Sequence, residues 1–299
     1  MKIEVTVGVC ARNCENAIQL IIDRLNSQDF SHDKIEVIFV EEGSTDNTLS
    51  SILQQVSRLD MKYQIYNQKW RGLGFSRNII FKKAHGKYLL WIDDGTFIPR
   101  NYIRKQVSFM EKNSNVGIAT GFIKEYTGSN IISSLDNMIY LVFSHNHLGN
   151  SSKFPGIGGS IYRLAAMRQV GGFDEQINGA FEDTDIAYRI RLAGWKIYIT
   201  NTVFDRDYSN SLKQSWKKNV WYGYGLHFFL HKHKELRELI YKSTPLAGIL
   251  EGLVISKQSF KITYKKISFI LPLFFFIKRL AWVFGFLNSH IDEYGHNIF

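Results

Sequence analysis

One stretch decides the fold of this chain: Gly86-Lys87-Tyr88-Leu89-Leu90-Trp91-Ile92-Asp93-Asp94-Gly95-Thr96-Phe97-Ile98-Pro99. Its apolar run has the length of one buried strand and stops at two carboxylates. The chain then turns at Gly95 and reaches Pro99, which suits the first turn of a helix. Ligands of open α/β sheets bind beyond the carboxyl ends of the strands, so Asp93 and Asp94 are expected at a binding site. Such a pair can hold a divalent cation against phosphate, although solvated acids in an Asp-Gly turn would give the same pattern.

The residues before this stretch alternate between strand and helix patterns. Apolar, β-branched runs predict strands over residues 3–9 and 35–40 and a weaker strand over 61–66. Apolar residues at helical spacing predict helices between them, over 13–28, from the mid-forties toward 58, and over 73–84. This β-α-β-α order predicts a parallel sheet wound in Rossmann fashion.

The turns between these elements are acidic or rich in glycine. The second strand ends in Glu41-Glu42-Gly43-Ser44-Thr45-Asp46-Asn47, whose serine, threonine and aspartate can each cap the next helix. Further on, Gly72 and Gly74 let the backbone approach a ligand closely. A helix start that carries Arg77 and Asn78 favours phosphate, although surface arginines at a helix start would look much the same.

The second half carries a glycine-rich turn followed by acids. Gly156-Ile157-Gly158-Gly159-Ser160 precedes a strand-like segment, and Gly171-Gly172-Phe173-Asp174-Glu175 follows it. A helix is then predicted from Glu182-Asp183-Thr184-Asp185 to about Gly194. Acids in a first helical turn are favoured by the helix dipole, which alone would explain them. Asp183, however, lies on the apolar face of that helix, and an inward carboxylate near a glycine-rich turn is a candidate general base.

Composition indicates a globular protein of one α/β domain with an extension. The 299 residues are 45% hydrophobic and 14% aromatic. Cys10 and Cys14 have no other cysteine to pair with and no nearby histidine, which indicates a reducing compartment and argues against a metal site. The first residues enter a strand pattern directly, so we expect no signal peptide.

Positive charge is concentrated toward the C-terminus. Residues 210–299 hold 13 Lys and Arg against 5 Asp and Glu, a balance of +8 out of the total of +10. A basic region rich in aromatic residues suits nucleic acid or an anionic membrane, and its apolar content favours the membrane and argues against nucleic acid. A solvated basic helical face is the alternative.

The final hundred residues are predicted to be helical. Residues 212–231 are aromatic and basic, 235–256 look helical, and 267–287 are mostly apolar but interrupted by Pro272, Lys278 and Arg279. A spanning helix needs about 20 apolar residues with few charges. We therefore expect this last segment to lie in the membrane interface rather than to cross it. A buried helix or a contact between copies of the chain is the alternative.

Taken together, these motifs resemble glycosyltransferase family 2, the inverting GT-A type, from Val5 to about Gly225. The family usually has Asp-Asp-Gly-Ser where this chain has Glu41-Glu42-Gly43-Ser44. The other marks are Arg77-Asn78, Gly86-Lys87-Tyr88, Asp93-Asp94, Gly171-Gly172-Phe173-Asp174-Glu175 and Glu182-Asp183-Thr184-Asp185. Each mark is weak alone, but together, in the family's order, they are specific.

The resemblance implies a role for each marked residue. Glu41 would contact the base or ribose of a nucleotide-sugar, Arg77 would approach its diphosphate, and Asp183 would be the general base of a single displacement. Gly158 and Gly159 would lie near a sugar. Asp93, at the first position of the family's DxD motif, would bind Mg²⁺ or Mn²⁺, with Asp94 or Asp205 as a second ligand. The further donor- or acceptor-binding residues are Ala11, Gly43, Ser44, Gly72, Asn78, Asp94, Glu182 and Lys217.

Three departures from the family pattern bear on the metal and the nucleoside. Glu41 is one methylene longer than the usual aspartate. The DxD motif reads Asp93-Asp94-Gly95 and lacks its last carboxylate. Where the family often has a histidine, this chain has Val203-Phe204-Asp205-Arg206-Asp207, whose acids could supply an oxygen ligand. A cation that binds well only together with the nucleoside diphosphate is therefore expected.

The sequence thus predicts an α/β GT-A domain over residues 1–225, with a mostly parallel sheet flanked by helices. A helical, basic and aromatic extension over 226–299 associates with a membrane or with a second copy. The expected activity is inverting transfer of a hexosyl or N-acetylhexosaminyl group from a UDP- or GDP-sugar to a hydroxyl of a glycan or lipid-linked glycan, on the cytoplasmic face of the membrane. Transfer to a polyprenyl phosphate and a non-catalytic sugar- or nucleotide-binding relative are the alternatives.

Overall fold

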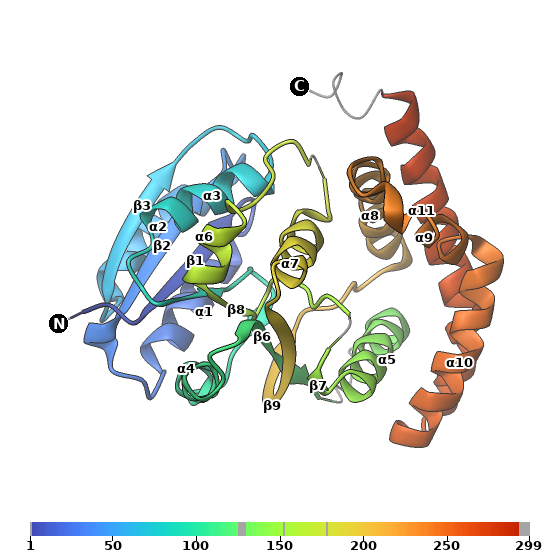
Figure 1. Cartoon of the computed structure of the whole chain (residues 1–299), viewed down its shortest axis with the longest axis horizontal. Coiled ribbons are helices and arrows are strands. Elements are labelled where there is room, and N and C mark those ends of the chain that lie inside the picture. Colours follow the sequence, from blue (N-terminus) through green and yellow to red (C-terminus); the bar gives the residue numbers. More distant parts are fainter. Residues whose placement is uncertain (1, 125–129, 152, 178, 293–299) are drawn as a thin grey trace. The chain divides into compact units, whose positions relative to one another are not determined.

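The computed structural model describes residues 2–124, 130–151, 153–177 and 179–292, and these form two compact units (Figure 1). The first unit comprises residues 1–123, 147–175 and 183–207. The second comprises residues 124–146, 176–182 and 208–299. This division differs from the predicted single boundary after residue 225, because helices that precede that point pack with the C-terminal helices.

The first unit is built on a mixed sheet. Its first four long strands are parallel, in the order β3-β2-β1-β4, as the alternating pattern predicts. They are β1 (Val5–Ala11), β2 (Ile35–Glu41), β3 (Lys62–Asn67) and β4 (Tyr88–Trp91). β1 and β2 are buried along nearly their whole length, which explains their continuous apolar sequence.

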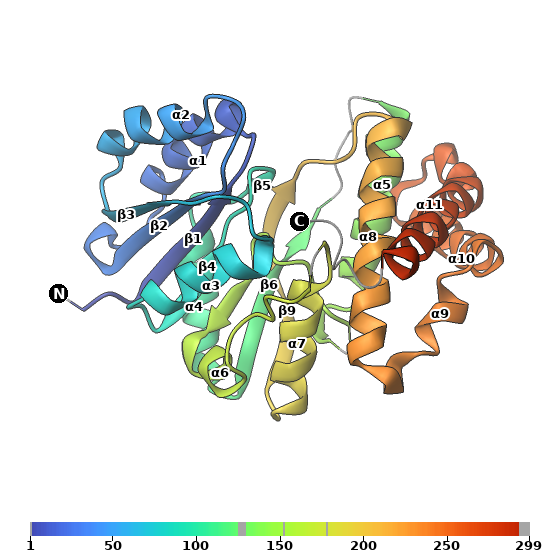
Figure 2. The same ribbon diagram turned by 90° about the horizontal axis from the view of Figure 1, so that it is seen from above.

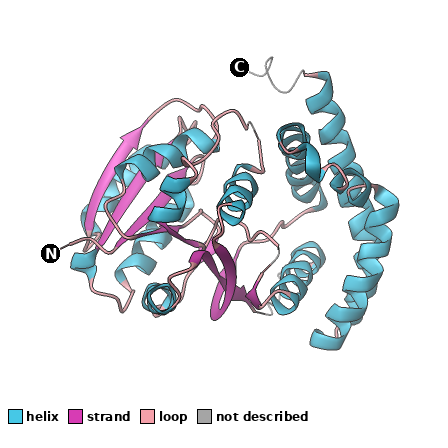
Figure 3. Ribbon diagram, viewed as in Figure 1, coloured by secondary structure: helices cyan, strands magenta, loops and turns pink. Residues whose placement is uncertain are grey.

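The other half of the sheet departs from the predicted parallel arrangement. β8 (Ile161–Arg163) pairs antiparallel with both β4 and β6 (Val116–Ile123), and β6 is parallel to β9 (Lys196–Arg206). The short β5 (Thr96–Phe97) and β7 (Gly149–Asn150) pair antiparallel with β9. Figure 3 shows these strands in magenta. The α/β class is therefore confirmed, with a mixed rather than a mostly parallel sheet.

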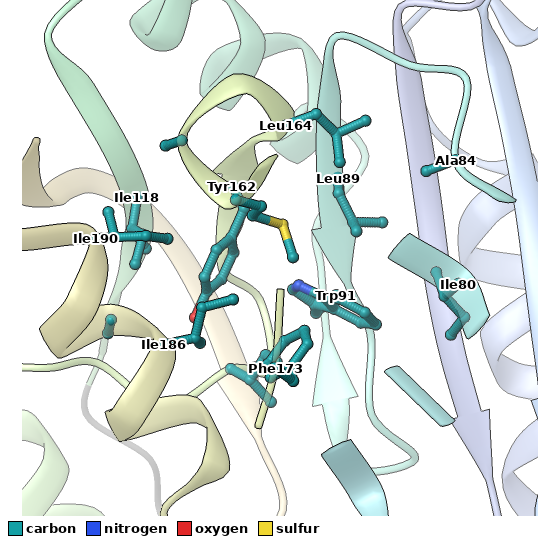
Figure 4. Close-up of a cluster of buried hydrophobic side chains, with 14 of the residues drawn as sticks. Ile80, Ala84, Leu89, Trp91, Ile118, Tyr162, Leu164, Phe173, Ile186 and Ile190 are labelled. Atoms are coloured by element: carbon teal, nitrogen blue, oxygen red, sulfur yellow. The ribbon is translucent and has the colours of Figure 1, made fainter. Parts of the chain in front are cut away.

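Helices cover both faces of the sheet. α1 (Glu15–Asn26) and α2 (Thr48–Gln55) lie on one side of β1, β2 and β3, and α3 (Leu73–Lys83) lies on the other (Figure 2). α6 (Leu164–Gln169) and α7 (Glu182–Leu192) share a buried apolar cluster with α3. In Figure 4 Trp91 lies at the centre of this cluster. Its ring and that of Phe173 pack edge to face, with their centroids 5.5 Å apart. Two short 3₁₀ helices, His32–Lys34 and Val56–Arg58, complete this part of the chain.

The segment after β4 differs from its prediction. Pro99 does not open a helix, because residues 96–97 pair with β9 as β5. α4 (Tyr102–Lys112) begins three residues later, and the Tyr102 amide donates to the Pro99 carbonyl oxygen at 2.9 Å. The pairing could not be predicted because β9 lies about a hundred residues further along the chain.

The second unit is helical, as predicted. It contains α5 (Ile131–Asn146), α8 (Leu212–Lys232), α9 (Leu239–Lys242), α10 (Pro245–Thr263) and α11 (Leu271–Ile291), with 3₁₀ turns at Lys234–Leu236 and Lys266–Ile270. The helix predicted over 235–256 is interrupted before Pro245, where the Thr244 hydroxyl accepts from the Ala247 amide and starts α10. Among the described residues, Lys266–Ile291 is long and apolar enough to cross a membrane by length and composition.

A buried arginine connects three elements of the first unit, and replacing it tests this packing. The Arg163 guanidinium donates to the carbonyl oxygens of Val116 at 2.9 Å, Met110 at 2.8 Å and Asn113 at 3.0 Å. We predict that Arg163→Met leaves these acceptors without a donor and lowers the free energy of unfolding by about 3 kcal/mol. Denaturant unfolding measures this loss. Arg168 is exposed, so Arg168→Met should change the free energy of unfolding by less than about 0.5 kcal/mol. Equal losses from the two changes would contradict the role of Arg163 in this packing.

Candidate active site

The carboxyl ends of three parallel strands meet at one edge of the sheet. The Glu42 amide donates to the Ala11 carbonyl oxygen at 3.0 Å, and the Ile92 amide donates to that of Gly8 at 3.0 Å. The residues that follow β1, β2 and β4 therefore lie next to one another, as expected for a binding edge. Ala11 ends β1, and its side chain is fully buried.

The loop after β2 is shaped by Glu41. Its carboxylate accepts from the backbone amides of Ser44 at 2.6 Å and Gly43 at 3.2 Å. Gly43 has a φ of +67°, which favours glycine. The Ser44 hydroxyl in turn accepts from the Asn13 amide at 3.0 Å. The predicted nucleoside-binding residues Glu41, Gly43 and Ser44 are thus brought together, and the carboxylate of Glu41 itself holds the loop.

Glu42 is a buried acid that the sequence did not single out. Its side chain is 2% exposed, and Oε1 meets no hydrogen-bond donor in the described part of the chain. Burial raises the pKa of Glu42 to about 7, and the Ser76 hydroxyl and the charges of Arg77 and Arg12 offset part of this rise. The only signal for it was its position beside Glu41 in the acidic pair.

Arg77 supplies a buried positive charge at this edge. Its side chain is almost fully buried, and Nη2 lies 3.8 Å from Oδ1 of Asp93. The same guanidinium is close enough to Glu42 to lower its pKa and lies over the ring of Trp91 at 6.0 Å. Arg77 is therefore fixed between the acids that follow β2 and β4, where it can meet a phosphate.

Asn78 does not lie with the predicted binding residues. Its side-chain amide donates to the Phe173 carbonyl oxygen at 2.9 Å and to Glu175 at 2.8 Å, and its oxygen accepts from the Phe173 amide at 2.9 Å. These bonds occupy the amide group, so Asn78 connects α3 to the turn of residues 171–175 rather than contacting a ligand. Gly72, with a φ of +95°, is the N-cap of α3, and Gly74 packs against the backbone of Asp174.

Gly158 and Gly159 form a tight turn against Asp93. A Cβ on Gly158 would lie 2.6 Å from the Thr96 hydroxyl and 2.9 Å from Oδ2 of Asp93, so only glycine fits. Gly159 has a φ of +78° and donates from its amide to the Trp91 carbonyl oxygen at 2.9 Å. Asp93 thus lies beside both Arg77 and the glycine turn.

Asp205 lies away from Asp93, contrary to the predicted metal pair. In the β5–β9 ladder Asp205 is opposite Phe97, whereas Thr96 is opposite Arg206. Thr96 and Asp93 face Gly158, whereas Asp207 and Asp205 lie on the side of Arg24, whose guanidinium lies 3.8 Å from the ring centroid of Phe97. The alternation of side chains along a strand separates the two groups.

Asp93 and Asp94 remain the oxygen ligands directly after β4, and Asp207 lies beside Asp94 and Gly95 as a further acid. The Asp93 side chain is 40% exposed, and Asp94 is exposed and accepts from the Gly95 amide. The described residues contain no group of three or more His, Cys, Asp or Glu side chains able to hold a metal. One or two carboxylates still suit Mg²⁺ or Mn²⁺ if a diphosphate supplies further oxygens.

The acids at the start of α7 have different surroundings. Asp183 is half-buried, and its Oδ1 accepts from the amide and hydroxyl of Thr184 at 2.7 and 3.3 Å. Asp185 is fully buried and bound to Arg189 at 2.7 Å, which also donates to the carbonyl oxygens of residues 170 and 172. Asp185 is therefore structural. The predicted ligands Glu182 and Lys217 belong to the second unit, Glu182 buried and Lys217 exposed on α8.

Comparison with protein-family models decides the family. Residues 6–171, more than half of the chain, match the model of glycosyl transferase family 2. The chain belongs to glycosyl transferase family 2. Within this family member, the matched region contains the β1, β2 and β4 edge, Arg77, Asp93 and the glycine turn.

Curated relatives match this chain over part of their length. An uncharacterized glycosyltransferase of Haemophilus influenzae is 36% identical over 114 residues, which are 38% of this chain and 34% of that protein. The poly(ribitol-phosphate) beta-N-acetylglucosaminyltransferase TarS of Staphylococcus aureus is 28% identical over 108 residues, which are 36% of this chain and 19% of TarS. The matches thus span about a third or less of these relatives.

Solved structures share the fold over nearly the whole chain. The mannosyltransferase PcManGT of Pyrobaculum calidifontis, in complex with GDP-Man and Mn²⁺, has a TM-score of 0.71 at 16% identity and covers 96% of this chain and 88% of its own. TarS 1–349 of S. aureus, in complex with UDP-GlcNAc, has a TM-score of 0.53 at 16% identity and covers 97% and 92%. This likeness confirms the predicted GT-A fold and the C-terminal helical region.

The raised pKa of Glu42 predicts a pH-dependent stability. The folded chain keeps this proton to about pH 7, whereas the unfolded chain loses it near the ordinary value of 4.5, so the folded state binds more protons in between. Stability from this group is therefore lost as pH rises from 4.5 to 7. Glu42→Gln imitates the neutral carboxyl and does not titrate. The free energy of unfolding of this variant, relative to that of the wild type, should therefore rise between pH 5 and 8 by on the order of 2–3 kcal/mol.

Denaturant unfolding at both pH values measures this change. Glu111→Gln is the control: Lys87 lowers the pKa of Glu111, so the stability from this group is lost only as pH falls below the ordinary value of 4.5, and the effect of the change should hardly vary between pH 5 and 8. A Glu42→Gln effect that does not vary with pH would contradict a buried neutral carboxyl.

Proposed function

We propose that the chain transfers a sugar from a nucleotide-sugar to a hydroxyl group of a glycan or lipid-linked glycan, with inversion at the anomeric carbon. One observation carries the proposal: the buried guanidinium of Arg77 lies 3.8 Å from Asp93 at the binding edge of a family 2 fold. The fixed guanidinium suits a negatively charged diphosphate, and the neighbouring carboxylate suits a divalent metal ion bound to that diphosphate.

The donor is proposed to be a UDP- or GDP-sugar that carries a hexosyl or N-acetylhexosaminyl group. The loop after β2 and the end of β1 at Ala11 would hold the nucleoside. The start of α3 would face the diphosphate, because Arg77 and the amides of a first helical turn favour anions. The complexes of PcManGT with GDP-Man and of TarS with UDP-GlcNAc support these two nucleotide classes.

The proposed reaction is a single displacement. The acceptor oxygen attacks the anomeric carbon as its proton passes to the Asp183 carboxylate, and the bond from that carbon to the diphosphate breaks with its electron pair on the leaving oxygen. The hydrogen bonds from Thr184 orient the Asp183 carboxylate. Arg77 would stabilise the charge that develops on the diphosphate.

A divalent cation fits this site as a partner of the diphosphate. Mg²⁺ or Mn²⁺ would be held by Asp93, with Asp94 second, and would neutralise charge on the leaving group. The partly exposed Asp93 carboxylate is accessible to such an ion. The Mn²⁺ in the PcManGT structure supports this choice.

We further propose that the protein works on the cytoplasmic face of a membrane, as a peripheral or monotopic protein. Free cysteines suit a reducing compartment, and the charge of +8 over residues 210–299 suits anionic lipid. A lipid-linked acceptor would be presented at the same surface. Self-association through the same helices is the competing explanation.

Asp183→Asn tests the proposed base. The amide keeps the shape of the carboxylate but cannot take a proton, so we predict a loss of sugar transfer on the order of 10²- to 10⁴-fold. Donor affinity should remain within about twofold, because the residue is assigned to the acceptor. Asp185→Asn is the contrast, since it should lower the unfolding midpoint through Arg189. Wild-type transfer by Asp183→Asn would remove the base and favour an acceptor that is already anionic, such as a polyprenyl phosphate.

Excess chelator tests the proposed cation. We predict that chelation reduces transfer at least about tenfold, that added Mg²⁺ or Mn²⁺ restores it, and that Asp93→Asn weakens cation binding in the presence of nucleoside diphosphate. Asp205→Asn is the control, because Asp205 lies on the side of Arg24. Full activity in chelator would leave the transferase proposal intact and assign the leaving-group charge to Arg77 or to lysines of α8.

A further inference from the structure

The outer face of α10 is apolar and then basic. Leu246, Leu250, Leu253 and Val254 are each more than half exposed, and Lys257 and Lys261 continue the row with exposed side chains. At about 100° per residue, these six positions fall within an arc of about 100°. A single strip of α10 therefore runs from leucines to lysines.

α11 carries a second apolar strip along its whole length. Leu273, Leu280, Phe284, Leu287 and Ile291 are exposed, the last to 74%, and they fall within an arc of about 60°. The strip runs parallel to the helix axis for about 27 Å. Phe269 and Ile270, in the turn before α11, extend it with exposed side chains.

Small residues occupy the inner faces of these helices. Gly248 and Gly252 of α10 lie against the backbone or stem of α11, where a Cβ would meet Arg279 or Pro272. Gly285 of α11 lies so close to Val220 of α8 that a Cβ would collide with its carbonyl oxygen. Two hydrogen bonds join the same pair of helices, from Trp282 to Asn219 and between His227 and Ser289.

Large apolar residues therefore lie on both sides of α11. Leu271, Phe274 and Phe275 are buried against α5 beside the small residues, and a second set faces outward, as in helices that contact lipid on one side. Figures 1 and 2 show α10 and α11 side by side, with α5 and α8 on the same side of the pair. The outer strips are therefore not covered by the other helices of this unit.

The charges around the strips select one kind of partner. Residues 252–291 contain six Lys and Arg and no Asp or Glu. Lys278 and Arg279 are paired within the unit, with Asp136 at 2.8 Å and Glu251 at 2.6 Å. The exposed Lys257, Lys261 and Lys266 cluster where α10 ends and the next turn begins. An apolar face with a basic end matches the acyl chains and headgroups of an anionic bilayer.

We propose that the outer strips of α10 and α11 form one docking surface for anionic lipid, on which both helices lie flat. This inference rests on the membrane location proposed above and names the surface, its orientation and the lipid class. The leucines and phenylalanines enter the level of the headgroups and upper acyl chains, and the lysines at the end of α10 contact lipid phosphates.

A flat orientation follows from the other side of α11. That side contacts α8 and α10, and the ion pairs of Lys278 and Arg279 lie near its middle. If α11 crossed the bilayer, Lys278 and Arg279 and their partners Asp136 and Glu251 would enter the hydrocarbon. Burying these charges is costly, and a helix that lies flat in the membrane interface avoids that cost.

Co-sedimentation of the full-length chain with vesicles tests the proposal. Phosphatidylcholine vesicles with phosphatidylglycerol should bind the wild type, and vesicles without it should bind more weakly. Leu250→Gln with Phe284→Gln should reduce binding at least about tenfold at low and high salt, because apolar burial is not screened. Lys257→Gln with Lys261→Gln should reduce it about tenfold or more at low salt and little at high salt.

Matched pairs in the first unit serve as controls. Leu20→Gln with Leu53→Gln removes two exposed leucines, and Lys105→Gln with Lys112→Gln removes two exposed lysines. Both should bind vesicles like the wild type. If the α10–α11 variants also bound vesicles as well as the wild type does, the proposal would be overturned.

Three further results would overturn it. A wild type that ignores anionic vesicles at low salt has no such surface. A dimer that dissociates on Leu250→Gln with Phe284→Gln, with vesicle binding unchanged, assigns the strips to a second copy. Retention on membranes after alkaline carbonate extraction assigns Lys266–Ile291 to a spanning helix. Thermal shifts with UDP and GDP, in the same preparations, report donor binding separately, so a failure of docking and a failure of the transferase proposal are distinguishable.

Discussion

The parallel pairing of β1 with both β2 and β4 is the constraint on which the candidate site depends. Parallel strands end at the same edge, so residues about 30 and about 80 positions apart along the chain become neighbours. One further backbone hydrogen bond follows the end of each of these strands. The Glu42 amide donates to the Ala11 carbonyl oxygen, and the Ile92 amide donates to that of Gly8. The acids after β2 and β4 are therefore positioned by buried backbone rather than by their own side chains.

Arg77 balances the charges that this pairing brings together. Burying a carboxyl such as Glu42 without a positive neighbour would be costly, and the raised pKa of Glu42 shows that the compensation is incomplete. α3 holds Arg77 in place because Asn78 and Gly74, on the same helix, pack on the turn of residues 171–175. The position of the Arg77 charge thus depends on how α3 packs on residues 171–175, about a hundred positions further along the chain.

The sequence predicted what depends on local pattern. The strands β1, β2 and β4, the helix that carries Arg77, the helix that begins at Glu182 and the family itself were predicted from apolar runs, glycines and acids. The antiparallel β8 and the β5–β9 pair could not be predicted, because their partners are remote and their own sequences are short. The same pairing explains the misplaced Asp205, since one step along a strand moves a side chain to the other face. Asn78 looked like a ligand for phosphate because its bonds to Phe173 have no local signal.

We propose that the buried Arg77 organises a binding site for a nucleoside diphosphate. Calorimetric titration of UDP and GDP into the wild type, Arg77→Lys and Arg77→Met tests it most directly, with Arg71→Lys, the change of an exposed arginine on Phe75, as control. We predict that the wild type and Arg71→Lys bind one of the two nucleotides with equal affinity. Both Arg77 variants should bind it at least about tenfold more weakly, because neither replaces the fixed planar guanidinium. Equal affinity in all four proteins would contradict it.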